Sequence, residues 1–233
     1  MNPPRAATVP ELSAIPGLVH GFEPRRPGAE PEAREAARER LAETLRPQGR
    51  LLLLRQVHGS AVRRAPWQGR PEADAAVADR PGLLLGIETA DCLPVLIADP
   101  RRRAVAAAHA GWRGTAAGVA RAAVNALRDG GSEPADLVAA LGPAIGPCCY
   151  EVGEELRVEF APEFFRPGPR GKPHLDVRAA NRAQLEAAGL RPERIHGVDE
   201  CTYCRPDRYH SYRREGKGAG RMISYVGFAA SPR

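Results

Sequence analysis

Short apolar runs separated by turn-forming segments dominate the chain, and this pattern predicts many short, buried strands. The longest runs have the length of a strand, well short of the ~20 apolar residues that a membrane-spanning helix needs. We expect strands at 18–22, 51–57, 75–78, 83–88, 94–99, 103–109, 137–141, 195–198 and 221–228.

Apolar residues at helical spacing predict four helices between these strands. The clearest helix spans 30–45, where alanines and leucines recur every four residues until Pro47 ends the pattern. The others are expected at 115–127, with Thr115 as the N-cap, at 152–160 and at 176–188. Residues 1–20 are expected to be mainly extended. Because strands and helices are mixed without strict βαβ alternation, the sequence favours an α+β sandwich of layers over a doubly wound sheet.

The length and composition suit one soluble domain. The chain has 233 residues, of which 43% are hydrophobic, so residues 1–233 can share one core, with the segment 1–50 packed onto it. The N-terminus carries Pro3, Pro4 and Glu11 and lacks the apolar region of a secretion signal. We therefore expect a cytoplasmic protein with no membrane partner and, by default, a monomer.

The charge is basic but dispersed. The formal net charge is +6, and 32 of the 34 basic side chains are arginines. They are scattered among glutamates, and aromatic residues make up only 5% of the chain, which favours a solvated mixed surface over a nucleic-acid-binding face. A small anionic substrate is the next alternative. A non-enzymatic metal-binding or RNA-binding module is a further hypothesis, and steep salt dependence of RNA binding would be its sign.

Three short strings carry the candidate chemistry: QVHG at 56–59, TADCLP at 89–94 and HAGWRG at 109–114. Each lies at the end of an apolar run and offers one metal ligand, namely His58, Cys92 and His109. Strand ends of one sheet converge at one edge, so we expect the three side chains to meet there. Two imidazoles and one thiolate match a catalytic zinc site, which keeps one coordination position open.

Zinc is the preferred metal, and copper is the alternative. Thiolate and imidazole ligands bind copper strongly. A laccase-type oxidase, however, needs several coppers and dense pairs of histidines, and this chain has six dispersed histidines.

Residues that flank the candidate ligands are candidates for proton transfer and substrate binding. Asp91 precedes Cys92 and could move a proton or orient a water, although a carboxylate that caps a tight turn is an equal alternative. Arg113 lies just before a predicted helix, where a guanidinium and free backbone N–H groups bind anions. Arg55 and Gln56 directly precede His58 and are further candidates for substrate contacts.

Two later segments add weaker candidates. The string GPAIGPCCY at 142–150 fixes its backbone with Gly and Pro, and Cys149 is its candidate for a contact with substrate. The string SYRR at 211–214 precedes three glycines, which is compatible with an anion-binding loop that includes Arg214.

Five cysteines in a chain without a secretion signal argue against a disulfide framework and predict reduced thiols. Cys201 and Cys204 form a lone CxxC pair, which is a weak signal because a structural zinc site needs a second ligand pair. Cys148 and Cys149 are adjacent and cannot easily bridge each other.

Taken together, these strings resemble the YfiH-like family, which also carries the names multicopper polyphenol oxidoreductase (laccase-like) and peptidoglycan editing factor. The resemblance runs from about residue 51 to 228. It rests on RQVHG at 55–59, TADCLP at 89–94, HAGWRG at 109–114, GPAIGPCCYEVG at 142–153, Asn181, CTYC at 201–204, SYRR at 211–214 and GR at 220–221.

The resemblance implies an α/β/β/α layered fold, similar to bacterial deamidating toxins that have a catalytic cysteine and histidine. It also implies zinc on His58, Cys92 and His109. The implied activities are phosphorolysis of adenosine, inosine or methylthioadenosine, and deamination of adenosine.

Two points stay open within this resemblance. Known zinc deaminases place a glutamate in an HxE string, which this chain lacks. Asp91 would have to take that part, or Glu88, which strand alternation turns away. The editing-factor name implies instead an amidase that removes serine from a cell-wall precursor, with Cys92 as nucleophile and His109 as base.

Overall fold

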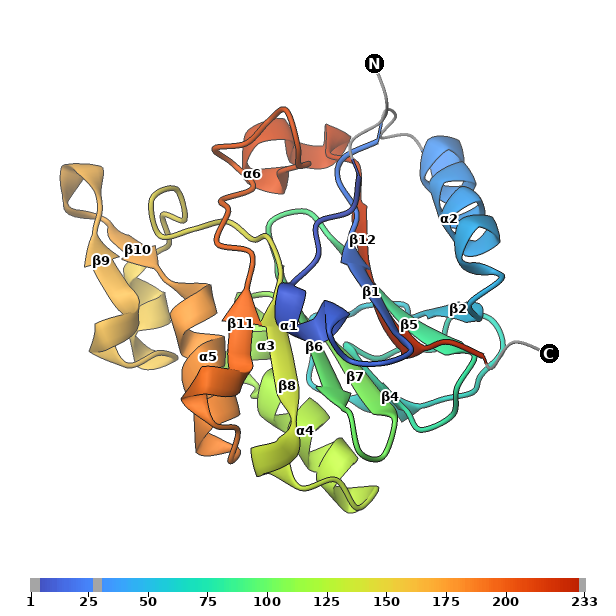
Figure 1. Cartoon of the computed structure of the whole chain (residues 1–233). Coiled ribbons are helices and arrows are strands. Elements are labelled where there is room, and N and C mark those ends of the chain that lie inside the picture. Colours follow the sequence, from blue (N-terminus) through green and yellow to red (C-terminus); the bar gives the residue numbers. More distant parts are fainter. Residues whose placement is uncertain (1–4, 27–30, 231–233) are drawn as a thin grey trace.

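Two β-sheets packed face to face form the centre of the computed structural model, which describes residues 5–26 and 31–230 (Figure 1). The six-stranded sheet has the order β11 (Ile195–Gly197), β8 (Val138–Leu141), β6 (Leu93–Asp99), β7 (Ala104–Ala110), β4 (Ala75–Ala78), β3 (Val62–Arg64). The four-stranded sheet has the order β1 (Leu18–Phe22), β12 (Met222–Phe228), β5 (Leu83–Thr89), β2 (Arg50–Leu53).

Alternation along β6 shows how the sequence builds this arrangement. Val95 and Ile97 belong to the core between the six-stranded sheet and its helices, whereas Leu96 and Ala98 belong to the core between the two sheets. A strand that is buried on both faces reads as a continuous apolar run, which is what the sequence shows here.

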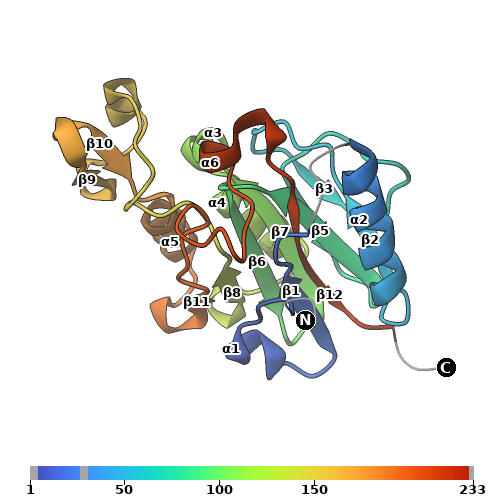
Figure 2. The same ribbon diagram turned by 90° about the horizontal axis from the view of Figure 1, so that it is seen from above.

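Helices cover the outer face of each sheet, so the layers run α/β/β/α, as the family resemblance implies (Figure 2). On the six-stranded sheet lie α3 (Trp112–Ala116), α4 (Val119–Asp129) and α5 (Val177–Ala187). On the four-stranded sheet, α2 (Pro31–Leu45) packs Leu41 and Leu45 against the outer face.

The remaining elements are short. They are the helices α1 (Pro10–Ser13) and α6 (Tyr212–Glu215), the hairpin of β9 (Phe165–Pro167) and β10 (Pro173–Leu175), and 3₁₀ turns at Pro134–Asp136, Glu154–Val158, Pro162–Phe164, Pro169–Gly171, Pro192–Arg194 and Gly216–Gly218. The hairpin projects from the α5 side of the molecule (Figure 1). Among the described residues, no helix combines the length and the apolar character needed to cross a membrane.

Most predicted strands are confirmed to within one or two residues, but several other predictions need correction. The strand expected at 51–57 ends at Leu53, because the chain then turns away to form the loop that carries His58. The helix expected at 115–127 begins at Trp112 and breaks at Gly118, whose φ of 79° is left-handed. Thr115 therefore lies inside α3 and does not cap a helix.

The helix expected at 152–160 is only the 3₁₀ turn Glu154–Val158. The segment 1–20, expected to be mainly extended, contains α1. Residue 30, the expected start of the first long helix, lies outside the described residues. The short strands β3, β9 and β10 were not predicted from the sequence.

Candidate functional site

A cavity of about 760 Å³ opens where the two sheets meet. Its wall combines the loop after β2, the link from β5 to β6, the end of β7, the start of α3, and side chains from α2 and α6. β5 and β6 belong to different sheets, so the site lies on the seam between the two layers. The sequence had suggested the edge of a single sheet instead. Its volume is in the range of small-molecule sites.

The structure brings His58, Cys92 and His109 together in this cavity. Each residue offers one ligand atom, and the three atoms lie within 4.8 Å of one another. The two imidazole rings meet edge to face with their centroids 4.8 Å apart. Three nitrogen and sulfur donors at this spacing, open to a cavity on one side, fit a metal with one free coordination position.

Unusual backbone conformations aim two of these side chains. His58 and Asp91 have left-handed φ values of 64° and 86°, so the chain turns sharply at and beside two ligands. Gly111 leaves room for the site, because a Cβ there would lie 2.9 Å from Cys92 Sγ and 3.3 Å from His58 Cδ2. A side chain at this position would displace the ligands.

Asp74, which the sequence analysis missed, connects two of the ligands. Its fully buried carboxylate accepts hydrogen bonds from the backbone N–H groups of Val57, His58 and Gly59 at 3.1, 2.9 and 2.7 Å. It also lies 2.8 Å from His109 Nδ1, which leaves Nε2 free to bind a metal. Carboxylates in this position fix the tautomer and the orientation of a metal-binding histidine. An acidic residue directly before a fully buried strand was the available signal.

Cys92 and His109 form a coupled ionic pair. Burial raises the pKa of the Cys92 thiol, but the His109 charge and hydrogen bonds from His109 and His58 outweigh it and bring that pKa down to about 6. Burial lowers the pKa of His109, whereas Cys92 and Asp74 raise it, to about 9. Without a metal, the pair is therefore a thiolate beside an imidazolium at neutral pH.

Asp91 lines the cavity, but its carboxylate is fully engaged. Oδ1 accepts from Thr202 Oγ1 at 2.6 Å, and Oδ2 accepts from Ser211 Oγ at 3.0 Å and from Arg213 N at 2.7 Å. Ser211 is the N-cap of α6, so Asp91 ties the loop that carries Cys92 to that helix. This geometry favours the turn-stabilising alternative over a mobile proton carrier.

The Glu88 side chain lines the cavity, contrary to the expectation that strand alternation turns it away from the metal site. Its carboxylate binds Arg38 at 2.8 Å and also binds Arg70. The side-chain amide of Gln56 pairs with the backbone N–H and C=O of Glu88 at 2.8 and 2.7 Å. Gln56 therefore fixes the wall, and Arg55 lies at the rim in an exposed ion pair with Glu72.

The wall is strongly positive. Its cations are Arg34, Arg38, Arg55, Arg70, Arg113, Arg213 and Arg221, against the carboxylates of Glu88 and Asp91. Arg113 stacks on the Trp112 ring at 4.3 Å. Tyr150 and Tyr212 add aromatic surface to the same wall.

Two predicted substrate residues lie away from the cavity lining. Cys149 faces Cys204, with the two sulfur atoms 3.4 Å apart. Arg214 donates to the backbone carbonyls of Thr202 and Tyr203, each at 2.8 Å, and so holds a loop together. Trp112, Tyr150 and Arg34 line the cavity instead. The sequence pattern had not singled them out for this role, because they come from segments far apart in the chain.

Comparisons with known proteins show which proteins the chain is similar to. A purine nucleoside phosphorylase of Streptomyces coelicolor is 44% identical over 207 residues, which cover 85% of this chain and 84% of that protein. The purine nucleoside phosphorylase YfiH of Escherichia coli is 38% identical over 205 residues, covering 85% and 82%.

Solved structures of similar proteins share the fold. YlmD from Geobacillus stearothermophilus superposes with a TM-score of 0.84 at 31% identity, covering 93% of each chain. The Neisseria meningitidis protein NMB0706 gives 0.84 at 32% identity, covering 97% of this chain and 99% of the other. The family model described as multi-copper polyphenol oxidoreductase laccase matches residues 25–229, and the chain belongs to this family.

Proposed function

We propose that this protein is a zinc-dependent purine nucleoside phosphorylase that acts on adenosine, inosine and methylthioadenosine, with adenosine deamination as a second activity. The observation that carries the proposal is a single cavity that combines a three-ligand metal site with an arginine wall and aromatic surface. The names of the relatives support the same reaction class.

Arg34 and Arg221 are the best candidates for binding phosphate. Arg34 Nη2 and Arg221 Nη1 both donate to the carbonyl of Ala219, at 2.8 and 2.9 Å, so two guanidinium groups lie side by side. Arg34 Nε is buried and has no hydrogen-bond partner among the residues that the structure describes. Burial and the neighbouring Arg34 charge lower the pKa of Arg221. A phosphate dianion between the two would relieve this repulsion and accept the unpaired N–H.

The aromatic side chains offer a place for the purine. Trp112, Tyr150 and Tyr212 line the cavity on the side of the metal ligands and Arg113. Burial raises the pKa of Tyr150, so its hydroxyl keeps its proton at neutral pH and can donate a hydrogen bond. A flat, polar-edged base suits such a wall.

In the proposed phosphorolysis, a phosphate oxygen forms a bond to C1′ of the ribose while the bond from C1′ to the purine nitrogen breaks. The arginines orient the phosphate, and the Tyr150 hydroxyl stabilises the departing purine, which then takes up a proton from solvent. When bound by His58, Cys92 and His109, zinc supplies a Lewis acid with one open position. Asp74 keeps His109 in the orientation that this requires.

For adenosine deamination, Glu88 is the better candidate to handle a proton. Of the described carboxylates that line the cavity, Asp91 is held by three donors from other elements, whereas Glu88 is held by two arginine side chains. Arg38 and Arg70 also line the cavity, so a bound anionic substrate can compete with Glu88 for their guanidinium groups.

Product analysis tests the proposal. Zinc-loaded protein is incubated with adenosine, with and without phosphate, and the products are separated by liquid chromatography. Adenine and ribose 1-phosphate that form only with phosphate support phosphorylase activity, and inosine without phosphate supports deamination. The proposal would be overturned if protein that holds zinc on His58, Cys92 and His109 converted none of the adenosine.

A variant pair tests the phosphate site. Arg34→Gln removes one charge-assisted contact worth about 1.5–3 kcal/mol, so we expect KM for phosphate to rise about 10-fold or more. Arg128→Gln, an exposed α4 position outside the cavity, is the matched control. An equal KM for both variants would remove Arg34 from the phosphate site.

One observation favours a second candidate function, a thiol amidase. Cys92, His109 and Asp74 form a thiolate–imidazolium pair oriented by a carboxylate, which is the constellation of cysteine hydrolases. The substrate would be an amide of serine in a cell-wall precursor. Hydrolysis that survives complete metal removal but stops on alkylation of Cys92 would support this function over the first.

A further inference from the structure

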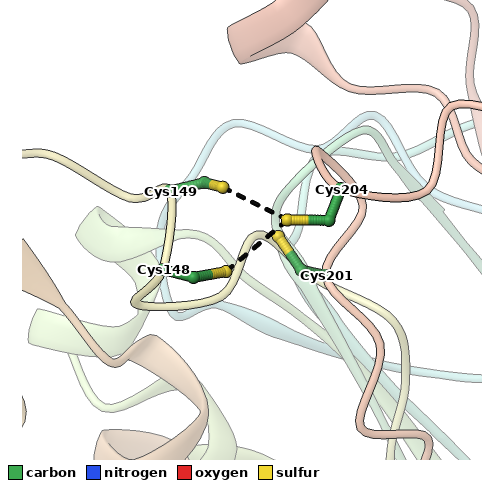
Figure 3. Close-up of side chains that lie close together, drawn as sticks. All are labelled: Cys148, Cys149, Cys201 and Cys204. Carbon is green, nitrogen blue, oxygen red and sulfur yellow. Dashed lines mark hydrogen bonds between the residues drawn. The ribbon is translucent and has the colours of Figure 1, made fainter.

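Four of the five cysteines gather in one place outside the cavity. Cys148 and Cys149 come from the turn after β8, and Cys201 and Cys204 from the loop after β11. Their sulfur atoms all lie within 4.8 Å of one another. Figure 3 shows all four thiols pointing into the same small volume from two loops. We call this group the four-cysteine cluster.

The spacing of the sulfur atoms matches a shared metal ion better than a disulfide. Cys204 Sγ lies 3.8 Å from Cys148 Sγ and 3.4 Å from Cys149 Sγ. A zinc ion with four thiolates at about 2.3 Å gives a tetrahedron with edges of about 3.8 Å. A disulfide needs a separation of about 2.05 Å and would use only two of the four thiols.

The CxxC pair lacked a partner in the sequence, and the fold supplies one. Cys148 and Cys149 are consecutive, yet both thiols point toward the loop of Cys201 and Cys204, because the chain turns at 147–149. Hydrogen bonds from Cys149 N and Tyr150 N to Gly146 O, at 2.9 and 3.0 Å, close this turn. Gly146 N also donates to Cys201 Sγ at 3.3 Å. Such hydrogen bonds to sulfur are typical of the surroundings of metal-bound thiolates.

We propose that the four-cysteine cluster binds a structural zinc ion, in addition to the metal site in the cavity. Four thiolate ligands fill the tetrahedral coordination of zinc, so no position stays open for substrate. Binding forms four zinc–sulfur bonds and releases the thiol protons to solvent, with no change of oxidation state.

The bound ion would join two loops that support the cavity. Beside Cys148 and Cys149, Tyr150 lines the cavity wall. Next to Cys201, Thr202 donates to the Asp91 carboxylate, and the backbone bridges Ala144 through Cys201. The second ion therefore stabilises the frame of the cavity without contacting the substrate.

Zinc content of purified variants tests this inference independently of any activity. The protein is expressed with added zinc, purified with a thiol reductant and without chelators, and measured by plasma mass spectrometry. We expect two zinc ions per chain in the unchanged protein and one in Cys92→Ala, where the four-cysteine cluster is intact. Cys204→Ser is expected to retain only the ion in the cavity.

Cobalt substitution gives a second readout that does not require Cys204→Ser to fold. In Cys92→Ala, a cobalt ion held by four thiolates is expected to show intense thiolate-to-cobalt absorption and tetrahedral ligand-field bands. A Cys92→Ala protein that holds no metal would overturn the inference. So would iron–sulfur absorption in the purified protein, or a disulfide within the cluster found by mass spectrometry of protein alkylated without a reduction step.

Discussion

Replacing Asp74 by asparagine is expected to weaken both the metal site and the fold. The carboxylate uses one oxygen for His58 N and His109 Nδ1 and the other for Val57 N and Gly59 N. Asparagine keeps one carbonyl oxygen, which can still accept hydrogen bonds. Its NH2 group is a donor and faces two N–H donors, so it cannot replace the second carboxylate oxygen. Two of the four hydrogen bonds therefore lose their acceptor in a fully buried position.

The magnitude follows from these four contacts. Each hydrogen bond to a charged group contributes about 1.5–3 kcal/mol, so losing two lowers the free energy of unfolding by roughly 3–6 kcal/mol. Loss of a carboxylate that orients a metal-binding histidine typically lowers metal affinity about 10–100-fold.

Urea unfolding measures the first effect, and zinc competition with a chromophoric chelator measures the second. The matched control is Asp79→Asn, because Asp79 forms an exposed ion pair with Arg64 at 3.0 Å. Such an exposed pair contributes at most about 1 kcal/mol to the free energy of unfolding. Zinc binding by Asp74→Asn as tight as in the unchanged protein, together with a free energy of unfolding within about 1 kcal/mol of it, would refute this role of Asp74.

Three further predictions follow from single features of the structure. Gly111→Ala places a Cβ 2.9 Å from Cys92 Sγ, so zinc affinity in the chelator competition should fall at least about 10-fold, while Gly218→Ala, with open space around it, should leave it unchanged. Removing zinc with a chelator should abolish phosphorolysis, and adding two equivalents, one for each proposed zinc site, should restore it; persistent activity would contradict metal dependence. Burial lowers the pKa of His20 to about 4, and Nε2 of the neutral ring accepts a hydrogen bond from the backbone N–H of Val9. Below pH ~6.5 His20 is protonated in the unfolded chain but stays neutral in the folded chain until about pH 4. The free energy of unfolding should therefore fall by up to about 3 kcal/mol between pH 7 and pH 4. His20→Gln should lack this loss in urea unfolding, and equal slopes for both proteins would contradict the assignment.

The strands could be predicted from the sequence because burial on both faces leaves a clear mark. β5, β6, β7 and β12 are mainly apolar, and each of their bounds differs from the expected one by at most one residue. The breaks could not be predicted as well. Gly118 interrupts a helical pattern through a left-handed φ, which periodicity does not encode.

That His58, Cys92 and His109 meet in one place was also predictable, because two histidines and a cysteine at strand ends are chemically conspicuous. What surrounds them was not, since Asp74 reaches two ligands through contacts 15 to 35 residues away in sequence. The four-cysteine cluster was hidden for the same reason, because its two loops are more than 50 residues apart.

The position of the cavity on the seam between the sheets has a mechanical consequence. His109 belongs to the six-stranded sheet, the loop of His58 follows the four-stranded sheet, and Cys92 lies where the chain crosses between them. A metal ion bound to all three cross-links the layers, so the sandwich cannot shear or open at this end while the ion is held. Amide hydrogens of β5 and β6 near this end should therefore exchange more slowly in the metal-bound protein.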